Sequence, residues 1–337
     1  MMYKVGICGF GKMGKIRAET VDSHPDLELK SIYDPIHKKT NRDDVNLCES
    51  YNQLLESDVD VVFIAGYVEY AAEYTRKALN AGKHVFCEKP PATHSHELIE
   101  VQASLDSSKK ILKYGFNHRY HYSVIEAKRI IDSGEIGEIT ILRGVYGKAG
   151  SLDFQKNWRN YKKFSGGGIL IDQGIHMLDL FMYLANSEFN CSGSIVRTLQ
   201  WDIECEDNVM ALFETGSGIV ASLHSSATQW KHKFNLEILG TKGFVTLDGI
   251  LSATMSYAPE KMIVGLRKDE RIGMSMGKPI EKVYIYEKDD SWLMELNEFV
   301  NAISGKRSVE NGTIADSVRA MKLVEDIYSK GSAIFKQ

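Results

Sequence analysis

Short apolar runs alternate with helical patterns through the first 120 residues of the chain. Each run has the length of a strand, and each helical stretch is near the length that a right-handed crossover between parallel strands requires. This alternation predicts βαβ units and a parallel sheet over residues 1–120. The apolar runs are Tyr3–Cys8, Leu27–Tyr33, Val59–Ala65, His84–Cys87 and Ile111–Phe116, and the helical stretches lie near Lys12–Val21, Tyr70–Asn80 and His96–Leu105.

The pattern changes after residue 120. A helix near Ser123–Ser133 leads into a strand at Glu138–Tyr146, and a glycine-rich stretch precedes a further helix. From Ser192 to Glu287, strand-like runs are separated by short turn signals, which favours a largely antiparallel sheet. Residues Lys261–Lys278 are basic and rich in Gly and Met, and we predict a mobile loop there. Two amphipathic helices end the chain, so we predict a second region of strands and helices over residues 121–337.

Composition narrows the classes of protein that fit. The 337 residues are 43% hydrophobic and 26% charged, which is typical of a globular protein of two domains. The net charge of −4 argues against a broad nucleic-acid-binding surface. Five scattered cysteines without a Cys-x-x-Cys motif indicate small buried residues in a reducing compartment. We see no signal peptide and no apolar run that approaches the ~18 residues of a membrane span, and therefore expect a cytoplasmic protein without membrane partners.

A glycine motif follows the first predicted strand directly. Glycines at these spacings permit a tight turn, a close approach to a pyrophosphate and close packing of the next helix, whose N-terminus attracts phosphate. The second strand ends in Asp34, where a carboxylate can accept hydrogen bonds from the adenosine ribose hydroxyls. The alternative is an ordinary turn with a solvated acid. The cofactor-binding residues expected from the loop are Gly9, Phe10, Gly11, Lys12, Met13 and Gly14.

Asp34 favours NAD over NADP, because a carboxylate repels the 2′-phosphate of NADP. No arginine follows it directly, although Lys38 and Lys39 are near enough in sequence to reach a phosphate. We therefore expect NAD as the cofactor and consider NADP the weaker alternative.

Two further motifs carry groups suited to acid–base chemistry. The strand His84–Cys87 is followed by Glu88 and Lys89, which lie at the carboxyl edge of the sheet, where the cofactor crevice is expected. Farther along, Asp172 and His176 are four residues apart and share one face if this stretch is helical. A carboxylate beside an imidazole is an arrangement that orients a general base.

These motifs resemble those of the glucose–fructose oxidoreductase / inositol dehydrogenase (Gfo/Idh/MocA) family. Besides the glycine loop, the matching segments are Ala81–Pro90, Phe116–Arg119, Gly134–Gly137 and Gly166–Asp179, in family order and with family spacing over the first ~180 residues. The resemblance implies a Rossmann dinucleotide-binding domain over residues 1–120. It implies a substrate-binding α/β domain over 121–337, built on a mostly antiparallel open sheet that commonly packs against another subunit. It also implies that Lys89, Asp172 and His176 surround the reacting carbon.

The chain departs from the family pattern at one place. Many relatives have Thr-Pro-Asn-x-x-His after the strand that ends near Ala65, and this chain has Gly66–Ala71 instead. We expect Tyr67 to contact the nicotinamide edge in place of those residues. Glu88 and Lys89 complete the expected set of cofactor-binding residues.

Several residues are candidates for substrate binding. An aromatic ring and a guanidinium at Trp158 and Arg159 suit sugars or phosphates, with packing or subunit contact as the alternative. Asn117 and Arg119 end a strand near the expected crevice, where a structural role fits equally well. Asp172 is also expected to hold a substrate hydroxyl.

Other aromatic and histidine residues carry weaker signals. Trp230 and His232 are expected on a later strand and suit a sugar ring, with packing again as the alternative. Four histidines suggest metal binding, but the first two indicate the start of a helix and no carboxylate cluster joins the other two, so we predict no metal site. These histidines are His94, His96, His118 and His121.

Together these features predict an NAD(P)-dependent oxidoreductase. A hydride would pass between nicotinamide and a secondary alcohol carbon of a sugar, nucleotide sugar or polyol. His176 would act as the base, tuned by Asp172, and Lys89 would stabilise alkoxide character. The alternatives are a family member that uses tightly bound NAD only transiently, and a non-catalytic NAD-binding sensor. We expect a homo-oligomer, dimer or tetramer, formed through the second-domain sheet.

Overall fold

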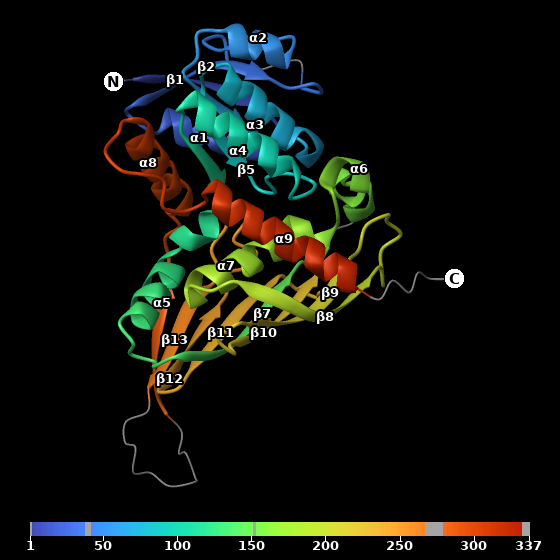
Figure 1. The fold of residues 1–337 in the computed structure, drawn as a ribbon, viewed down its shortest axis with the longest axis vertical. Coiled ribbons are helices and arrows are strands. Elements are labelled where there is room, and N and C mark those ends of the chain that lie inside the picture. The colour runs from blue at the N-terminus through green and yellow to red at the C-terminus, as the bar shows by residue number, and fades with distance from the viewer. Residues whose placement is uncertain (1, 38–41, 151–152, 267–278, 332–337) are drawn as a thin grey trace. The chain divides into compact units, whose positions relative to one another are not determined.

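The computed structural model describes residues 2–37, 42–150, 153–266 and 279–331 (Figure 1). The chain divides into two compact units. Unit 1 comprises Met1–Phe116, Lys163–Gly166 and Trp292–Lys322, and unit 2 comprises Asn117–Lys162, Gly167–Ser291 and Leu323–Gln337. The first crossing at residue 116 lies close to the boundary expected at residue 120. The return of Trp292–Lys322 to unit 1 differs from the expected division.

Unit 1 is built on a six-stranded sheet of order β3-β2-β1-β4-β5-β6. Every pairing in it is parallel, as expected from the alternation of strands and helices. Strands β4 and β6 are buried throughout, as expected where helices cover the faces of a parallel sheet. The predicted Rossmann arrangement is therefore confirmed. The strands are β1 (Tyr3–Cys8), β2 (Leu27–Tyr33), β3 (Asn46–Cys48), β4 (Val61–Ile64), β5 (His84–Glu88) and β6 (Leu112–Gly115).

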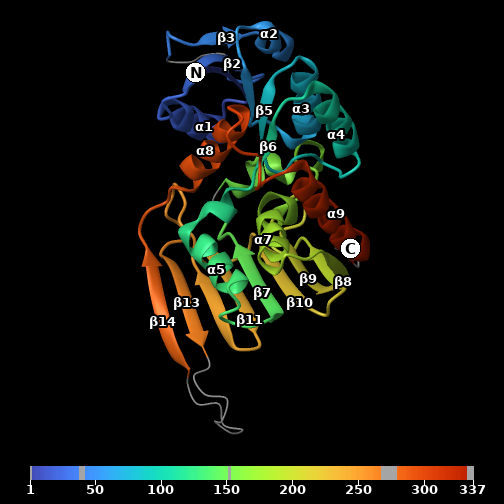
Figure 2. The same cartoon turned by 60° about the vertical axis from the view of Figure 1, so that its left-hand side comes forward.

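The helices of unit 1 include one from the far end of the chain. In α8, Leu296, Phe299 and Val300 are buried in the same hydrophobic core as Val5 and Ile7 of β1. The apolar face of that helix thus explains why the chain returns to unit 1. Helices α3 and α4 lie side by side (Figures 1 and 2). The helices are α1 (Lys12–Asp22), α2 (Tyr51–Glu56), η1 (Val68–Tyr70), α3 (Ala71–Asn80), α4 (Glu97–Ser108) and α8 (Ser291–Ile303).

Unit 2 is built on an eight-stranded sheet of order β14-β13-β12-β11-β7-β10-β9-β8. The β7–β10 pair is parallel and the other neighbours are antiparallel. The mostly antiparallel sheet predicted for the second domain is therefore confirmed. Its strands are β7 (Ile139–Gly147), β8 (Phe189–Arg197), β9 (Asn208–Thr215), β10 (Val220–Ser226), β11 (Lys233–Gly240), β12 (Gly243–Asp248), β13 (Glu260–Leu266) and β14 (Ile280–Tyr286).

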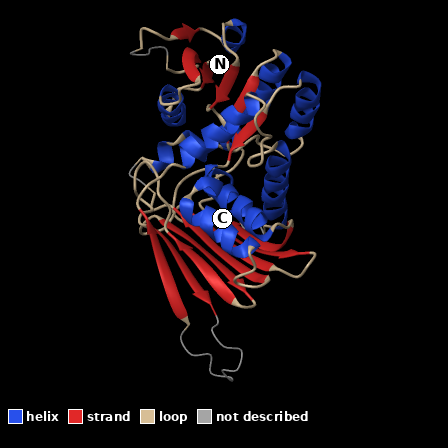
Figure 3. Cartoon of the chain, turned by 90° about the vertical axis from the view of Figure 1, so that its left-hand side faces the viewer, coloured by secondary structure: helices blue, strands red, loops and turns tan. Residues whose placement is uncertain are grey.

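Helices cover one face of the unit 2 sheet and leave the other open (Figure 3). Helix α5 contacts β12–β14, and α7 contacts β7 and β10. Burial alternates along β9, where Ala211 is buried while Met210 and Leu212 are exposed on the open face. The helical segments are η2 (Asn117–Tyr120), α5 (Tyr122–Asp132), η3 (Phe154–Lys156), η4 (Trp158–Asn160), the π-helix η5 (Leu170–Gly174) and α7 (Ile175–Ala185); α6 (Lys162–Ser165) and α9 (Ile314–Lys330) contain residues of both units.

Two expectations for the unit 2 strands were wrong. Residues 261–266 were expected in a loop, but they belong to β13, which pairs with both β12 and β14. The alternating apolar side chains of Met262 and Val264 are buried there, which outweighs the basic composition. Residues 267–278, the rest of the predicted loop, lie outside the described residues. Trp230 and His232 were expected on a strand but precede β11, which begins at Lys233.

The expectations for the cysteines and for membrane-spanning helices can also be compared with the structure. All five cysteines are free and buried, as predicted from their number and spacing. None of the helices in the described ranges has the length and apolar character needed to cross a bilayer.

Candidate active site

Close packing requires glycine at two of the three glycine positions of the loop in unit 1. Gly9 has a φ of +92°, and a Cβ there would lie 2.5 Å from the backbone nitrogen of Gly66. A Cβ on Gly14 would lie 2.0 Å from the carbonyl oxygen of Gly9. At Gly11, by contrast, no atom of the described chain lies within 4 Å of such a Cβ.

The open space beside Gly11 lies at the start of α1, which begins at Lys12. The first N–H groups of a helix have no partner within the helix, and its dipole favours negative charge at that end. The loop therefore fits the pyrophosphate of a dinucleotide.

Asp34 follows β2 and binds the glycine loop through hydrogen bonds. One carboxylate oxygen accepts the N–H of Phe10, and the other accepts those of Ile36 at 2.7 Å and His37 at 2.8 Å. Burial acts to raise the pKa of Asp34, but these backbone hydrogen bonds outweigh it and hold the pKa below its ordinary value. Asp34 is thus an ionised carboxylate beside the expected ribose position. Lys38 and Lys39, weighed above as phosphate ligands, lie outside the described residues.

Tyr67 lies directly after the close approach of Gly66 to Gly9. Its ring is half-buried and faces the ring of Phe164 with centroids 5.1 Å apart. Phe164 belongs to the short segment Lys163–Gly166 that joins unit 1. Tyr67 therefore packs against an aromatic ring from a distant part of the sequence, and its expected contact with the nicotinamide edge stays a prediction.

Glu88 ends β5 and its carboxylate is bound inside unit 1. Arg17 Nε donates to Glu88 Oε1 at 2.6 Å, and the same guanidinium donates to Glu295 Oε2 at 2.6 Å. Arg17 is fully buried and lies over the rings of Phe86 and Trp292. The carboxylate of Glu88 therefore anchors the end of β5. Lys89 follows directly after this strand, and its side chain is half-buried. The cofactor contact expected for Glu88 stays a prediction.

In unit 2 the glycine run allows close packing around one buried carboxylate. Glu206 accepts hydrogen bonds from the N–H of Gly168 at 2.9 Å and of Leu170 at 3.1 Å, and from the hydroxyl of Tyr328 at 2.8 Å. A Cβ at Gly168 would lie 2.1 Å from the Glu206 carbonyl oxygen, and one at Gly167 would lie 2.2 Å from the Tyr328 hydroxyl. The run thus fixes the start of the π-helix η5.

Asp172, on η5, is held by two cations. Its two carboxylate oxygens accept hydrogen bonds from Lys148 Nζ and, at 3.2 Å, from Arg159 Nε. The guanidinium of Arg159 lies 4.4 Å from the ring centroid of Trp158. Three expected substrate-binding residues, Trp158, Arg159 and Asp172, are therefore brought together. Lys148, just beyond β7, was not singled out from the sequence; its signal is a lysine at the end of a central strand.

His176 lies one helical turn further, at the start of α7, and is buried. Its ring stacks on that of His118, with centroids 3.8 Å apart and an angle of 11° between the planes. The stretch that carries Asp172 and His176 is helical, as the prediction required, and the shared face of the two side chains stays a prediction. The tuning of His176 by Asp172 stays a prediction.

Arg119 and Asn117 both make contacts within unit 2. Arg119 forms a two-pronged ion pair with the buried Asp179, at 2.8 Å from Nε and 2.6 Å from the terminal nitrogen. Asn117 Nδ2 donates to Ser291 Oγ at 3.3 Å. These contacts favour the structural alternative for both residues, and their substrate contacts stay predictions.

The histidines considered for metal binding lie in different surroundings. His94 and His96 lie before α4, whereas the imidazole of His121 is bound to Glu260 at 3.0 Å. Across the described part of the chain, no group of three His, Cys, Asp or Glu side chains is arranged to hold a metal ion.

Two models of known protein families match the chain. A model of the oxidoreductase family described as an NAD-binding Rossmann fold matches residues 3–116, and a model of the GFO/IDH/MocA C-terminal domain matches residues 124–246. The chain belongs to the Gfo/Idh/MocA family of oxidoreductases. The resemblance seen in the motifs is confirmed, and the β1–β6 sheet is part of an NAD-binding domain.

Similar proteins act on polyols and sugars. The chain is 27% identical over 278 residues to inositol 2-dehydrogenase of Salmonella typhimurium, covering 77% of each chain. It is 25% identical over 328 residues to myo-inositol 2-dehydrogenase of Thermotoga maritima, covering 92% of this chain and 91% of that one.

Two solved structures share the fold. Levoglucosan dehydrogenase in complex with NADH and levoglucosan matches with a TM-score of 0.85 and 21% identity over 98% of both chains. A 3-ketoreductase of Actinomadura kijaniata in complex with NADP and TDP-benzene matches with a TM-score of 0.84 and 21% identity over the full length of both chains.

Proposed function

We propose that the protein is an NAD-dependent dehydrogenase that oxidises a secondary alcohol carbon of a sugar, nucleotide sugar or polyol. The observation that carries this proposal is the cluster around Asp172 in unit 2. There a carboxylate, two basic side chains and an indole ring lie together, one helical turn from a buried imidazole. Carboxylates and cations hydrogen-bond hydroxyl groups, and an aromatic face packs on the C–H face of a sugar ring.

The residues divide the chemistry between them. His176 removes the hydroxyl proton of the substrate, and Lys89 donates a hydrogen bond to the same oxygen as it gains alkoxide character. The substrate carbon loses a hydride and becomes a carbonyl, and bound NAD supplies the hydride acceptor. Asp172 holds a neighbouring hydroxyl, and its own position is held by Lys148 and Arg159.

The substrate class is supported by the relatives, which include inositol dehydrogenases and, by fold, a levoglucosan dehydrogenase. The test is a panel of inositols, sugars and nucleotide sugars offered with NAD and, separately, with NADP, followed by the absorbance of the reduced cofactor. At least one polyol or sugar is expected to yield NADH. A panel that yields no reduced cofactor with a protein that binds NAD contradicts the proposal of net oxidation. We also propose a cytoplasmic location, which the free cysteines support.

Asp34 is expected to set the coenzyme preference. Asp34→Ser removes a charged acceptor for the ribose hydroxyls and a charge that repels the 2′-phosphate. The ratio of kcat/KM with NAD to that with NADP should fall by roughly tenfold to a hundredfold, the range for losing a hydrogen bond to a charged group. Steady-state kinetics with both cofactors measure this ratio.

The matched control is Asp58→Ser, which removes a carboxylate from an exposed position of unit 1 whose side chain is 84% accessible. That variant should keep the parent ratio. Equal affinities for NAD and NADP in the unmodified protein would overturn the assignment of Asp34.

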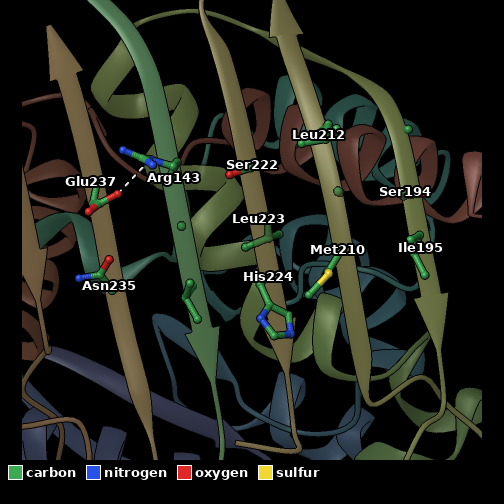
Figure 4. A pocket seen from close by; sticks show the side chains of 14 residues that line it. Arg143, Ser194, Ile195, Met210, Leu212, Ser222, Leu223, His224, Asn235 and Glu237 are labelled. Carbon is green, nitrogen blue, oxygen red and sulfur yellow. Dashed lines mark ion pairs between the residues drawn. The ribbon is translucent and has the colours of Figure 1, made fainter.

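We propose that the open face of the unit 2 sheet joins two copies of the chain. Ile195, Met210 and Leu212 are each more than half exposed on this face. Figure 4 shows Ile195 on one strand and Met210 and Leu212 on the neighbouring strand, with the Arg143–Glu237 ion pair at 2.9 Å farther across the sheet, beyond β10. An apolar patch rimmed by polar groups, on strands whose other face is already covered, favours burial against a second subunit.

Light scattering at micromolar concentration tests this interface. The parent protein is expected to be at least a dimer, and Leu212→Arg should shift it toward the monomer because a charge would be buried in the apolar patch. Ile99→Arg is the control, since Ile99 is an exposed isoleucine on α4 of unit 1. A monomeric parent protein rules out the proposal.

A further inference from the structure

A second imidazole lies flat against His176 within unit 2. The rings of His118 and His176 have centroids 3.8 Å apart and nearly parallel planes. Both residues are buried, although His118 comes from η2 and His176 from α7. The stack therefore joins two segments that are distant in the sequence.

The partners of His118 assign its neutral tautomer. Asn117 Nδ2 donates to Ser291 Oγ, which leaves the amide oxygen of Asn117 to accept from His118 Nδ1 at 3.1 Å. His118 Nε2 then accepts from the hydroxyl of Tyr146 at 2.9 Å. Burial raises the pKa of that hydroxyl well above its usual value, so Tyr146 keeps the proton that it donates. With one ring nitrogen donating and the other accepting, His118 is held uncharged.

We propose that His118 is a positioning residue that orients His176 and stabilises its imidazolium form while it holds the substrate proton. This inference rests on the function proposed above. A cation is attracted to the π-face of an uncharged aromatic ring at this separation. A protonated His118 would repel the same imidazolium, so the hydrogen bond from Tyr146 is part of the arrangement.

The charged groups packed around the stack are paired among themselves. His121, whose ring lies 5.6 Å from that of His118, is bound to Glu260, and Asp289 lies 4.0 Å from the same imidazole. On η2 itself, Arg119 is paired with Asp179.

On the side of η5, Asp172 is paired with Lys148 and Arg159. Two tyrosines complete the surroundings: Tyr146 contacts both stacked rings, and Tyr257 packs against Tyr146. The aromatic contact with His118 involves the ring of His176 itself, so a change of protonation at His176 acts on this contact directly.

Three variants of the full-length protein separate the contribution of the His118 ring from that of the Tyr146 hydroxyl. His118→Phe keeps an uncharged aromatic face, His118→Leu removes it, and Tyr146→Phe removes the hydroxyl that keeps His118 neutral. The readouts are an NMR titration of the His176 imidazole and the dependence of kcat/KM on pH. In His118→Leu, the pH midpoint of His176 should fall by about 0.5 to 1 unit relative to the parent, the size of a partly desolvated cation–π interaction.

His118→Phe should keep the parent midpoint and restore most of the turnover that His118→Leu loses. In Tyr146→Phe the pH midpoint of His176 should also fall, because His118 can then take up a proton and repel the imidazolium. The two imidazoles should then titrate in two linked steps. Equal midpoints in the parent, the Leu variant and the Tyr146 variant would overturn the proposal, as would a Phe variant that behaves like the Leu variant. If the Leu variant does not fold, the comparison of the Phe and Tyr146 variants still decides. The NMR titration requires no substrate, so failure of the proposed reaction is distinguished from failure of the stack.

Discussion

Replacing His176 with alanine is expected to lower kcat by two or more orders of magnitude, as is replacing Lys89 with alanine. Loss of a general base or of an oxyanion stabiliser typically costs about a hundredfold or more. Neither change should abolish NAD binding, because the phosphate and ribose contacts are expected from the glycine loop and Asp34. Steady-state kinetics with the substrate identified from the panel, and a separate measurement of NAD binding, give the two quantities.

His94→Ala and Lys77→Ala are the matched controls, since both side chains lie on the surface of unit 1. They should retain parent turnover. Because His176 and Lys89 are proposed to act on one substrate oxygen, the double variant should lose far less than the product of the single losses. Parent activity in either single variant would show that the catalytic assignment is wrong.

Replacing Arg17 with leucine is expected to destabilise the fold by about 3–5 kcal/mol. That is the usual cost of removing one partner of a buried ion pair and leaving its counter-charge without compensation. Here two carboxylates, Glu88 and Glu295, share the single buried guanidinium. Urea unfolding followed by circular dichroism measures the change.

Arg129→Leu is the control for the loss of Arg17. Arg129 also binds two carboxylates, those of Glu126 and Glu135, but at the surface of α5, and its loss should change stability little. Equal urea midpoints for Arg17→Leu and Arg129→Leu would contradict a structural role for the buried cluster.

The same cluster gives unit 1 a dependence of stability on pH. Burial raises the pKa of Glu295 from 4.5 to about 7, against the opposing charges of Arg17 and Lys113. Because the folded-state pKa is the higher one, this contribution to stability is fully present below pH 4.5 and is lost as the pH rises through 7. Glu295→Gln should therefore show a smaller fall in unfolding free energy across that interval than the parent. If the unfolding free energy of Glu295→Gln depends on pH as that of the parent does, the assignment of this pH dependence to Glu295 is wrong.

Local patterns were sufficient to predict most of unit 1. The strands Tyr3–Cys8 and Leu27–Tyr33 have their predicted bounds, because the apolar residues that each strand buries lie close together in the sequence and need no information from the rest of the chain. The three-residue strand β3 and the helix α2 were not predicted, since each is too short to show a period. The place of α8 in the core of unit 1 depends on contacts nearly 300 residues apart in sequence, which no local pattern contains.

The motifs of the candidate site could be predicted from the sequence, but the residues that contact Asp172 and His176 could not. The helical stretch that carries Asp172 and His176 was predicted from the sequence, and their four-residue spacing predicts a shared face. The sequence does not indicate that Lys148 binds Asp172 or that His118 stacks on His176, because tertiary packing brings these residues together. Arg119 illustrates the converse. A polar residue at a strand end suits a binding role until its ion pair with the buried Asp179 is seen.

The central claim is direct transfer of a hydride from a sugar or polyol carbon to NAD. It is tested most directly with a substrate that carries deuterium on the carbon to be oxidised. Mass spectrometry of the nicotinamide then follows the label. We predict one deuterium on the nicotinamide ring for each substrate carbonyl formed. A substrate consumed without deuterium in the released cofactor would contradict net oxidation by the dehydrogenase proposed here.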